Sequence, residues 1–321
     1  MKGDLSVSDL TISFQGPKGV ACVIENAGLE IPAGKKVALV GESGSGKTVV
    51  AKTILGLLPA NASVRSGEMS FGDLPILRNG KRVSRSVRGK EIAMIFQNPK
   101  SSLNPIRKIG LQIEDVLRQH TRLSRREIKP AAIAALASVR LPDPERIYHA
   151  YPFELSGGMA QRALISVALA CNPSLLIADE PTTGLDVSLQ REVMELIQSI
   201  SSQRGMSLLL ITHDLAVAQE YCDSVVVMHA GHVVEKCPVK ELLVNPSHPY
   251  TRALIRSTPN AIEHLSELRP IRGTLPDLYL PQPACRFIHR CGQRMPICEA
   301  PPPIFYEEVA EDHSVLCRRP M

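Results

Sequence analysis

The amino-acid sequence predicts an α/β protein: a largely parallel core sheet with an added antiparallel part, a helical subdomain and a small cysteine-rich C-terminal extension. Three observations predict this class. KVALV at residues 36–40 and LLIADE at 175–180 have the length and apolar character of buried parallel strands. Residues 109–118 and 126–139 carry apolar side chains at helix spacing. Beyond residue 240 the composition shifts towards proline, and four cysteines follow.

The first apolar run leads directly into GESGSGKT, at residues 41–48. Glycines at these positions let the backbone fold tightly around an anion with its N–H groups pointing inward, and the helix that starts near Lys47 adds the positive end of its dipole. We therefore predict a phosphate-binding loop. Lys47 is expected to bridge the β- and γ-phosphates of a nucleotide, and the Thr48 hydroxyl to bind Mg²⁺.

The run LLIADE ends in two carboxylates, so a buried strand delivers negative charge to the edge of a sheet, where phosphates bind in such folds. Asp179 is expected to hold Mg²⁺, directly or through water. Glu180 is expected to polarise the water that attacks the γ-phosphate.

A second anion site is predicted within LSGGMAQR, at residues 155–162. Ser156, Gly157 and Gly158 precede an apolar helix at residues 163–170, so a hydroxyl and bare backbone N–H groups gather at a helix N-terminus.

These segments occur in a fixed order with Gln97, in AMIFQNP, and His213, in LLLITHD. The order resembles the ATP-binding subunits of ABC transporters over about the first 240 residues. The resemblance implies a P-loop NTPase with a RecA-like core. We expect the nucleotide-binding core at residues 1–90 and 161–240, the helical subdomain with the signature motif at 91–160, and a C-terminal extension at 241–321.

The resemblance also implies roles for single residues. Gln97 would sense Mg²⁺ and the attacking water, His213 would contact the γ-phosphate, and the Phe14 ring would stack on adenine. The segment from Ser156 to Gly158 would contact the γ-phosphate held by the opposite subunit of a head-to-tail dimer. The implied ATP-binding residues of one chain are Phe14, Gly41, Glu42, Ser43, Gly44, Ser45, Gly46, Lys47, Thr48 and Val49. The implied catalytic residues are Lys47, Gln97, Glu180 and His213, and the implied Mg²⁺ ligands are Thr48, Gln97 and Asp179.

The composition agrees with a protein that acts beside a membrane through other chains. With 321 residues, 44% of them hydrophobic, the chain can bury a sizeable core, but no run reaches the ~20 apolar residues that cross a bilayer. The N-terminus has no apolar core of a signal peptide. We expect a peripheral protein at the cytoplasmic face of the cell membrane. The net charge of +5 is too balanced to indicate nucleic-acid binding, and the basic run at residues 81–90 is expected to be a solvated loop.

The C-terminal region indicates a branch of the family. HPYTRALIRSTP at residues 248–259, RGTLPDLYLPQPACRFIHRC at 272–291 and SSLNP at 101–105 resemble the importers of oligopeptides and dipeptides, with nickel importers close by. The resemblance implies ATP-driven peptide import with two membrane-spanning permease subunits, a second ATP-binding chain and, indirectly, an extracytoplasmic substrate-binding protein. Two alternatives are import of nickel or a metal chelate, and a soluble ABC protein that acts on DNA or ribosomes.

The eight cysteines form two groups. One group is scattered among apolar neighbours and is expected to behave as small buried hydrophobes: Cys22, Cys171, Cys222 and Cys237. The other group stands in the proline-rich stretch with five, six and eighteen residues between its members: Cys285, Cys291, Cys298 and Cys317. Because a reducing cytosol disfavours disulfides, four clustered thiols indicate a metal site.

A set of four cysteines suits an iron–sulfur cluster or tetrahedral zinc, and this spacing lacks the paired C-x-x-C segments usual for structural zinc. The resemblance to peptide importers, some of which carry a [4Fe–4S] cluster there, ranks iron–sulfur first, zinc second and free thiols third. Three arginines lie between the cysteines and are expected to be solvated, or else to offset thiolate charge: Arg286, Arg290 and Arg294.

Overall fold

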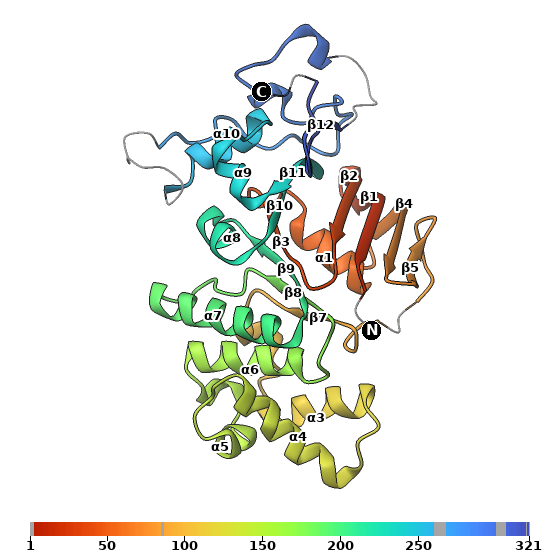
Figure 1. Cartoon of the computed structure of the whole chain (residues 1–321). Coiled ribbons are helices and arrows are strands. Elements are labelled where there is room, and N and C mark those ends of the chain that lie inside the picture. Colours follow the sequence, from red (N-terminus) through yellow and green to blue (C-terminus); the bar gives the residue numbers. More distant parts are fainter. Residues whose placement is uncertain (1–2, 85–86, 260–267, 300–305, 319, 321) are drawn as a thin grey trace. The chain divides into compact units, whose positions relative to one another are not determined.

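The computed structural model describes residues 3–84, 87–259, 268–299, 306–318 and 320, which form two compact units (Figure 1). Among these residues, unit 1 comprises 87–209 and unit 2 comprises 3–84 and those from 210 onward. The predicted C-terminal extension, 241–321, therefore lies partly outside the described residues. The boundary between the units falls within strand β9, Ser207–Thr212.

Unit 2 begins with an antiparallel sheet whose strands follow the order β2-β1-β4-β5-β6. The first two strands form a long hairpin, in which Leu5 pairs with Ile31 and Gly16 with Gly19. Apolar residues recur on the buried face of this hairpin, as the alternation of a half-buried strand requires. The strands are β1 Leu5–Gly16, β2 Gly19–Ile31, β4 Ala62–Phe71, β5 Leu74–Arg78 and β6 Lys81–Arg82.

The other strands of unit 2 combine parallel and antiparallel pairing. β3, Lys36–Val40, is almost entirely buried and pairs in parallel with β10, Ser224–His229. β10 turns through Ala230 and Gly231 into β11, His232–Pro238, and the two strands form an antiparallel hairpin. β11 then pairs with β13, His313–Val315, and β13 with β12, Glu307–Ala310, so the end of the chain joins this sheet.

The helices of unit 2 lie at the ends of these strands. α1 starts at Lys47, as predicted, and ends at Gly56, whose left-handed conformation closes the helix. Arg82 donates hydrogen bonds to the carbonyl groups of Thr53 and Ile54 in the last turn of α1. The expectation that the basic run at residues 81–90 is a solvated loop is therefore wrong for Arg82. Residues 85–86 of this run lie outside the described residues. The helices are α1 Lys47–Leu55, α8 Leu215–Tyr221, α9 Val239–Val244 and α10 Pro249–Arg256, with short 3₁₀ turns η4 Ile288–Arg290 and η5 Pro296–Glu299.

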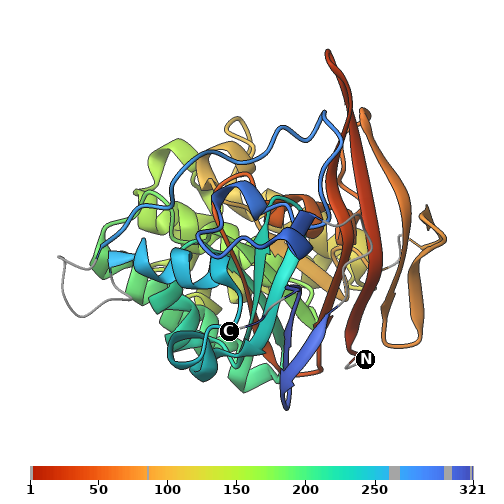
Figure 2. The same cartoon turned by 90° about the horizontal axis from the view of Figure 1, so that it is seen from above.

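The segment from residue 268 to 280 belongs to unit 2 and reaches the β1–β2 hairpin (Figure 2). The Cys22 N–H donates to the Leu278 carbonyl over 3.3 Å. The chain after α10 is therefore attached to the first strands of the protein.

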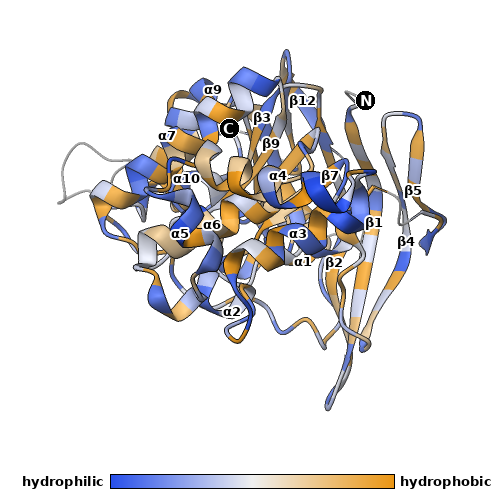
Figure 3. Ribbon diagram, turned by 90° about the horizontal axis from the view of Figure 1, so that it is seen from below, coloured by the Kyte–Doolittle hydropathy of each residue, from blue (hydrophilic) through white to orange (hydrophobic). Residues whose placement is uncertain are grey.

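Unit 1 is mainly helical around the parallel pair β7, Ile92–Ile95, and β8, Leu175–Asp179, in which Ile92 pairs with Leu175. Along α3 the side chains of Ile109, Ile113 and Leu117 are buried at helix spacing, and hydrophobic and hydrophilic residues alternate on its ribbon (Figure 3). The two predicted helices of this region are confirmed. The helices are α2 Pro99–Ser102, α3 Ile109–His120, α4 Arg125–Ser138, α5 Pro144–His149, α6 Gly157–Leu169 and α7 Val187–Arg204, with the 3₁₀ turn η1 Pro152–Glu154.

No helix in the described part of the chain is long and apolar enough to span a membrane.

Candidate functional site

The phosphate loop of unit 2 connects β3 to α1 and holds a buried lysine. Gly41 has φ 151°, and a Cβ atom there would lie 2.2 Å from the Met228 carbonyl oxygen, so glycine is required. The Lys47 side chain folds back, and its Nζ donates to the Gly41 carbonyl over 2.8 Å and to the Glu42 carbonyl over 2.9 Å. With Lys47 only 5% exposed, the loop places a positive charge at the N-terminus of a helix, which suits an anionic ligand.

The remaining residues predicted in unit 2 lie on separate elements. Phe14 is half-buried on β1, where it pairs with Ala21 of β2 and Ala62 of β4. His213 is exposed directly after β9. The next residue, Asp214, is the N-cap of α8, and its carboxylate accepts from the Ala216 N–H over 2.8 Å. This cap holds the backbone next to His213 in place.

In unit 1 the structure brings two of the predicted residues together. Asp179 is buried at the end of β8, and Glu180 follows it. The Glu180 carboxylate accepts from Gln97 Nε2 over 2.8 Å and from Thr183 Oγ1 over 3.0 Å. Glu180 also has φ 46°, a left-handed conformation that costs a residue with a side chain on the order of 1 kcal/mol. The carboxylate is therefore held in one position by its neighbours.

The predicted signature segment starts helix α6 of the same unit. Ser156 is the N-cap residue, and its Oγ accepts from the Met159 N–H over 3.3 Å. Ser156 and Gly157 are exposed, whereas Gly158 is buried against Leu189. The N-terminus of a helix of 13 residues is thus open to a ligand or another chain.

The four clustered cysteines line one pocket of about 530 Å³ in unit 2. Burial, and to a smaller extent the other three thiols, raise the pKa of Cys285 to about 11. No three of their sulfurs lie within 4.8 Å of one another in the described residues. Tetrahedral zinc with Zn–S bonds of 2.3 Å would require separations of about 3.8 Å.

The arginines between these cysteines are not solvated as expected. The Arg286 side chain is 1% exposed and donates to Glu25 over 2.6 Å, and Arg290 pairs with Glu42. Only Arg294, 52% exposed, fits the expectation. Composition could not show this, because the partners lie more than 240 residues away along the chain.

Two of the scattered cysteines also differ from the expectation. Cys222 and Cys237 are buried, but Cys22 and Cys171 are half-buried. Their thiols are weak donors to the carbonyl groups of Ile24 and Val116. Apolar neighbours in sequence therefore did not ensure burial.

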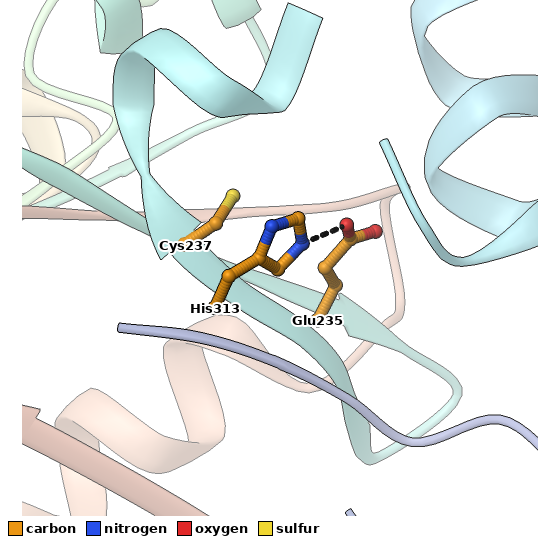
Figure 4. Close-up of side chains that lie close together, drawn as sticks. All are labelled: Glu235, Cys237 and His313. Carbon is orange, nitrogen blue, oxygen red and sulfur yellow. Dashed lines mark hydrogen bonds and ion pairs between the residues drawn. The ribbon is translucent and has the colours of Figure 1, made fainter. Parts of the chain in front are cut away.

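A further cluster, which the sequence did not indicate, joins Glu235 and Cys237 of β11 to His313 of β13 (Figure 4). All three are buried. Glu235 Oε1 lies 2.8 Å from His313 Nε2 and accepts from the Ser247 N–H over 2.7 Å, while Oε2 accepts from the His248 N–H over 3.0 Å. Burial raises the pKa of the Cys237 thiol and keeps it protonated. Through these contacts Glu235 links β11 to β13 and to the residues that start α10.

We predict that His313→Ala lowers the free energy of unfolding by about 2–4 kcal/mol, because Glu235 would lose a partner while remaining buried. Urea unfolding of the purified chain measures this change, with exposed His289→Ala as the control. The metal content should equal that of the wild type. Loss of one metal ion per chain in His313→Ala would instead identify the cluster as a metal site.

Comparison with known proteins gives one consistent result. Residues 24–183 match the model of the ABC transporter family, and residues 234–298 match that of the oligopeptide/dipeptide transporter C-terminal region. The chain is 42% identical to a probable peptide ABC transporter ATP-binding protein of Sinorhizobium fredii, over 98% of this chain and 94% of the relative. It is 40% identical to the dipeptide transport ATP-binding protein DppD of Bacillus subtilis, over 93% and 90%.

Solved structures share the fold. A dimeric ATP-binding cassette in a post-hydrolysis state, bound to ADP and Pi, superposes with a TM-score of 0.64 at 25% identity, over 73% of this chain and 98% of that one. The fold-class prediction is confirmed for the nucleotide-binding part.

Proposed function

Because the chain belongs to the ATP-binding subunits of ABC transporters and carries the C-terminal region of the oligopeptide/dipeptide branch, we propose that it hydrolyses ATP to drive import of dipeptides or oligopeptides across the cytoplasmic membrane. One observation carries the peptide assignment. The match to the C-terminal region starts at residue 234, within β11, and continues through α10 to the third clustered cysteine. The relatives named for peptide transport match over nearly the whole chain.

The phosphate loop and the acidic strand end supply the residues of the ATP site in this proposal. Lys47 binds the β- and γ-phosphates, and Glu180, held by Gln97, orients the attacking water. His213 contacts the γ-phosphate, and Phe14 stacks on adenine. The hydroxyl, amide and carboxylate oxygens of Thr48, Gln97 and Asp179 are suitable Mg²⁺ ligands, and the ion would neutralise phosphate charge.

The exposed N-terminus of α6 supports an assembly of two ATP-binding chains. Ser156 and Gly157 present a hydroxyl and free backbone to another chain, where they would bind the γ-phosphate held by that chain. The proposed partners are a second, related ATP-binding subunit, two membrane-spanning permeases and, through them, an extracytoplasmic substrate-binding protein. Attachment to the permeases would place the chain at the cytoplasmic face of the membrane.

The cargo is tested by uptake of a labelled dipeptide and of labelled nickel in cells that lack only this gene. We expect dipeptide uptake to fall to background and nickel uptake to persist, with recovery on complementation. Loss of nickel uptake alone would assign the chain to metal import and leave the ATP-site proposals standing. Unchanged uptake of both would contradict the proposed cargo.

For the catalytic role, Glu180→Gln should bind ATP normally and hydrolyse it about 10²–10³-fold more slowly, because the amide cannot polarise the attacking water. The readout is phosphate release by the reconstituted transporter, with a fluorescent ATP analogue as the binding check. Glu195→Gln, an exposed carboxylate of α7 that pairs with the exposed Arg191, is the matched control. Hydrolysis within threefold of the wild type would exclude this role for Glu180.

The four-cysteine pocket fits a resident metal cofactor, and we propose a [4Fe–4S] cluster. All four cysteines line one cavity, whose volume exceeds the need of a single ion, and no three of their sulfurs are as close together as tetrahedral zinc requires. When bound, the cluster would join the segments at Cys285, Cys291, Cys298 and Cys317 covalently through iron. Its contribution would be structural, since the proline-rich segment has few large apolar residues to fold it.

Anaerobically purified protein should be brown and should contain about four iron atoms per chain. Cys298→Ser should lose iron and colour. Cys171→Ser, which changes a half-buried cysteine of unit 1, should retain both. Colourless protein with one zinc ion per chain would favour zinc instead.

A further inference from the structure

Glu42 lies inside the phosphate loop and is held at three points. Its carbonyl accepts from Lys47 Nζ over 2.9 Å, and its N–H donates to the Tyr250 hydroxyl over 2.9 Å. Its carboxylate accepts two hydrogen bonds from the Arg290 guanidinium, over 2.7 and 2.9 Å. Two of these three contacts therefore come from residues far beyond the nucleotide-binding motifs.

Arg290 is itself rigidly placed. Its side chain is 5% exposed, its Nε donates to the Arg272 carbonyl over 3.0 Å, and its guanidinium lies 5.9 Å from the centre of the Phe287 ring. The next residue in the chain is Cys291, which lines the four-cysteine pocket. The four-cysteine pocket and the phosphate loop are therefore joined through two consecutive residues, because Cys291 lines the pocket and Arg290 binds Glu42 of the loop.

The C-terminal segment makes a second contact with the phosphate loop, at Gly44. A Cβ atom on Gly44 of the loop would lie 3.2 Å from Leu275 Cδ1, so this leucine packs against the bare backbone of the loop. The loop is therefore supported on two sides by the segment from residue 272 to 291.

A carboxylate in a phosphate loop has an electrostatic cost. Glu42 is 27% exposed, and like charges at short range in a partly buried site repel strongly. Burial raises the pKa of Glu42, but the two hydrogen bonds from Arg290, together with the His229 ring 3.6 Å away, outweigh burial and lower it to about 2, so the group is ionised at neutral pH. Burial lowers the pKa of His229, whose ring is packed against Tyr250 and Phe287, so Arg290 supplies the permanent positive charge.

We propose that Arg290 is a positioning residue of the ATP site: it neutralises and orients Glu42, so that ATP affinity depends on how the C-terminal segment is docked on the phosphate loop. The bidentate fork fixes both the charge and the orientation of the carboxylate, which a single point charge does not do. The proposal rests on the assignment of the loop to ATP and is independent of the cargo and of the metal in the cysteine pocket.

The test measures binding of a fluorescent ATP analogue to the purified full chain, with Mg²⁺ present. Arg290→Ala should raise Kd about tenfold, the order expected for loss of a charge-assisted bidentate pair. The double variant Arg290→Ala/Glu42→Gln should return to within about threefold of the wild type, because no unpaired carboxylate remains beside the phosphates. Arg290→Lys, which keeps the charge and loses the fork, should fall between them and replaces Arg290→Ala if that variant fails to fold.

Arg286→Ala is the matched control, because it removes a similarly buried arginine of the same segment from its ion pair with Glu25. It should lower the thermal unfolding temperature as Arg290→Ala does, but Glu42→Gln should not restore any change in its Kd. Failure of Glu42→Gln to restore the Kd of Arg290→Ala would reduce Arg290 to a structural role, and an unchanged Kd in Arg290→Ala would overturn the proposal. If the wild type does not bind the analogue, the ATP assignment itself fails.

Discussion

The conformation of the phosphate loop depends on the buried ammonium group of Lys47. A buried cation needs oxygen partners, and the loop folds so that the carbonyl groups of Gly41 and Glu42 provide them. This fold is possible because β3 and α1 fix the two ends of the loop and because Gly41 adopts a conformation in which the Met228 carbonyl leaves no room for a side chain. Carbonyl dipoles compensate the charge in part, and a phosphate group would do so fully.

The C-terminal segment is part of the same unit as this loop. Glu235 receives N–H groups from Ser247 and His248 and pairs with His313, which attaches the start of α10 and the last strand to β11. Arg286 joins the same segment to Glu25 of β2. Glu235, His313 and Arg286 are buried, so removing the partner of one of them leaves an uncompensated polar group inside the protein. The segment is therefore an integral layer of unit 2, and its state affects the loop through direct contacts.

The sequence was informative wherever the structure is encoded locally. The strand from Lys36 to Val40, the loop after it and the cap of α6 at Ser156 follow from apolar runs, glycines and a capping hydroxyl within a few residues. It was uninformative where a charged residue finds its partner across the fold. The partners of Arg286 and Arg290 lie 261 and 248 residues away, and a basic residue in a proline-rich stretch has no local signal of burial. The role of Gln97 was inferred from motif order alone, since a glutamine has no pattern of its own, and its contact with Glu180 was not predicted.

The ion pair between Glu42 and Arg290 matters because Glu42 is an acid within the phosphate loop. A phosphate loop gains nothing electrostatically from a carboxylate, so the residue needs a partner, and the nearest basic group of the loop, Lys47, contacts the Glu42 carbonyl. Arg290 fills this need from a segment that must first dock on the loop. Because Glu42 is ionised, nucleotide affinity depends on whether the segment that carries Arg290 is docked on the loop. Cys291 follows Arg290 and lines the four-cysteine pocket, so the docking of Arg290 depends in turn on the folding of that pocket. A neutral residue at position 42 would remove this dependence while leaving the backbone of the loop able to bind phosphate.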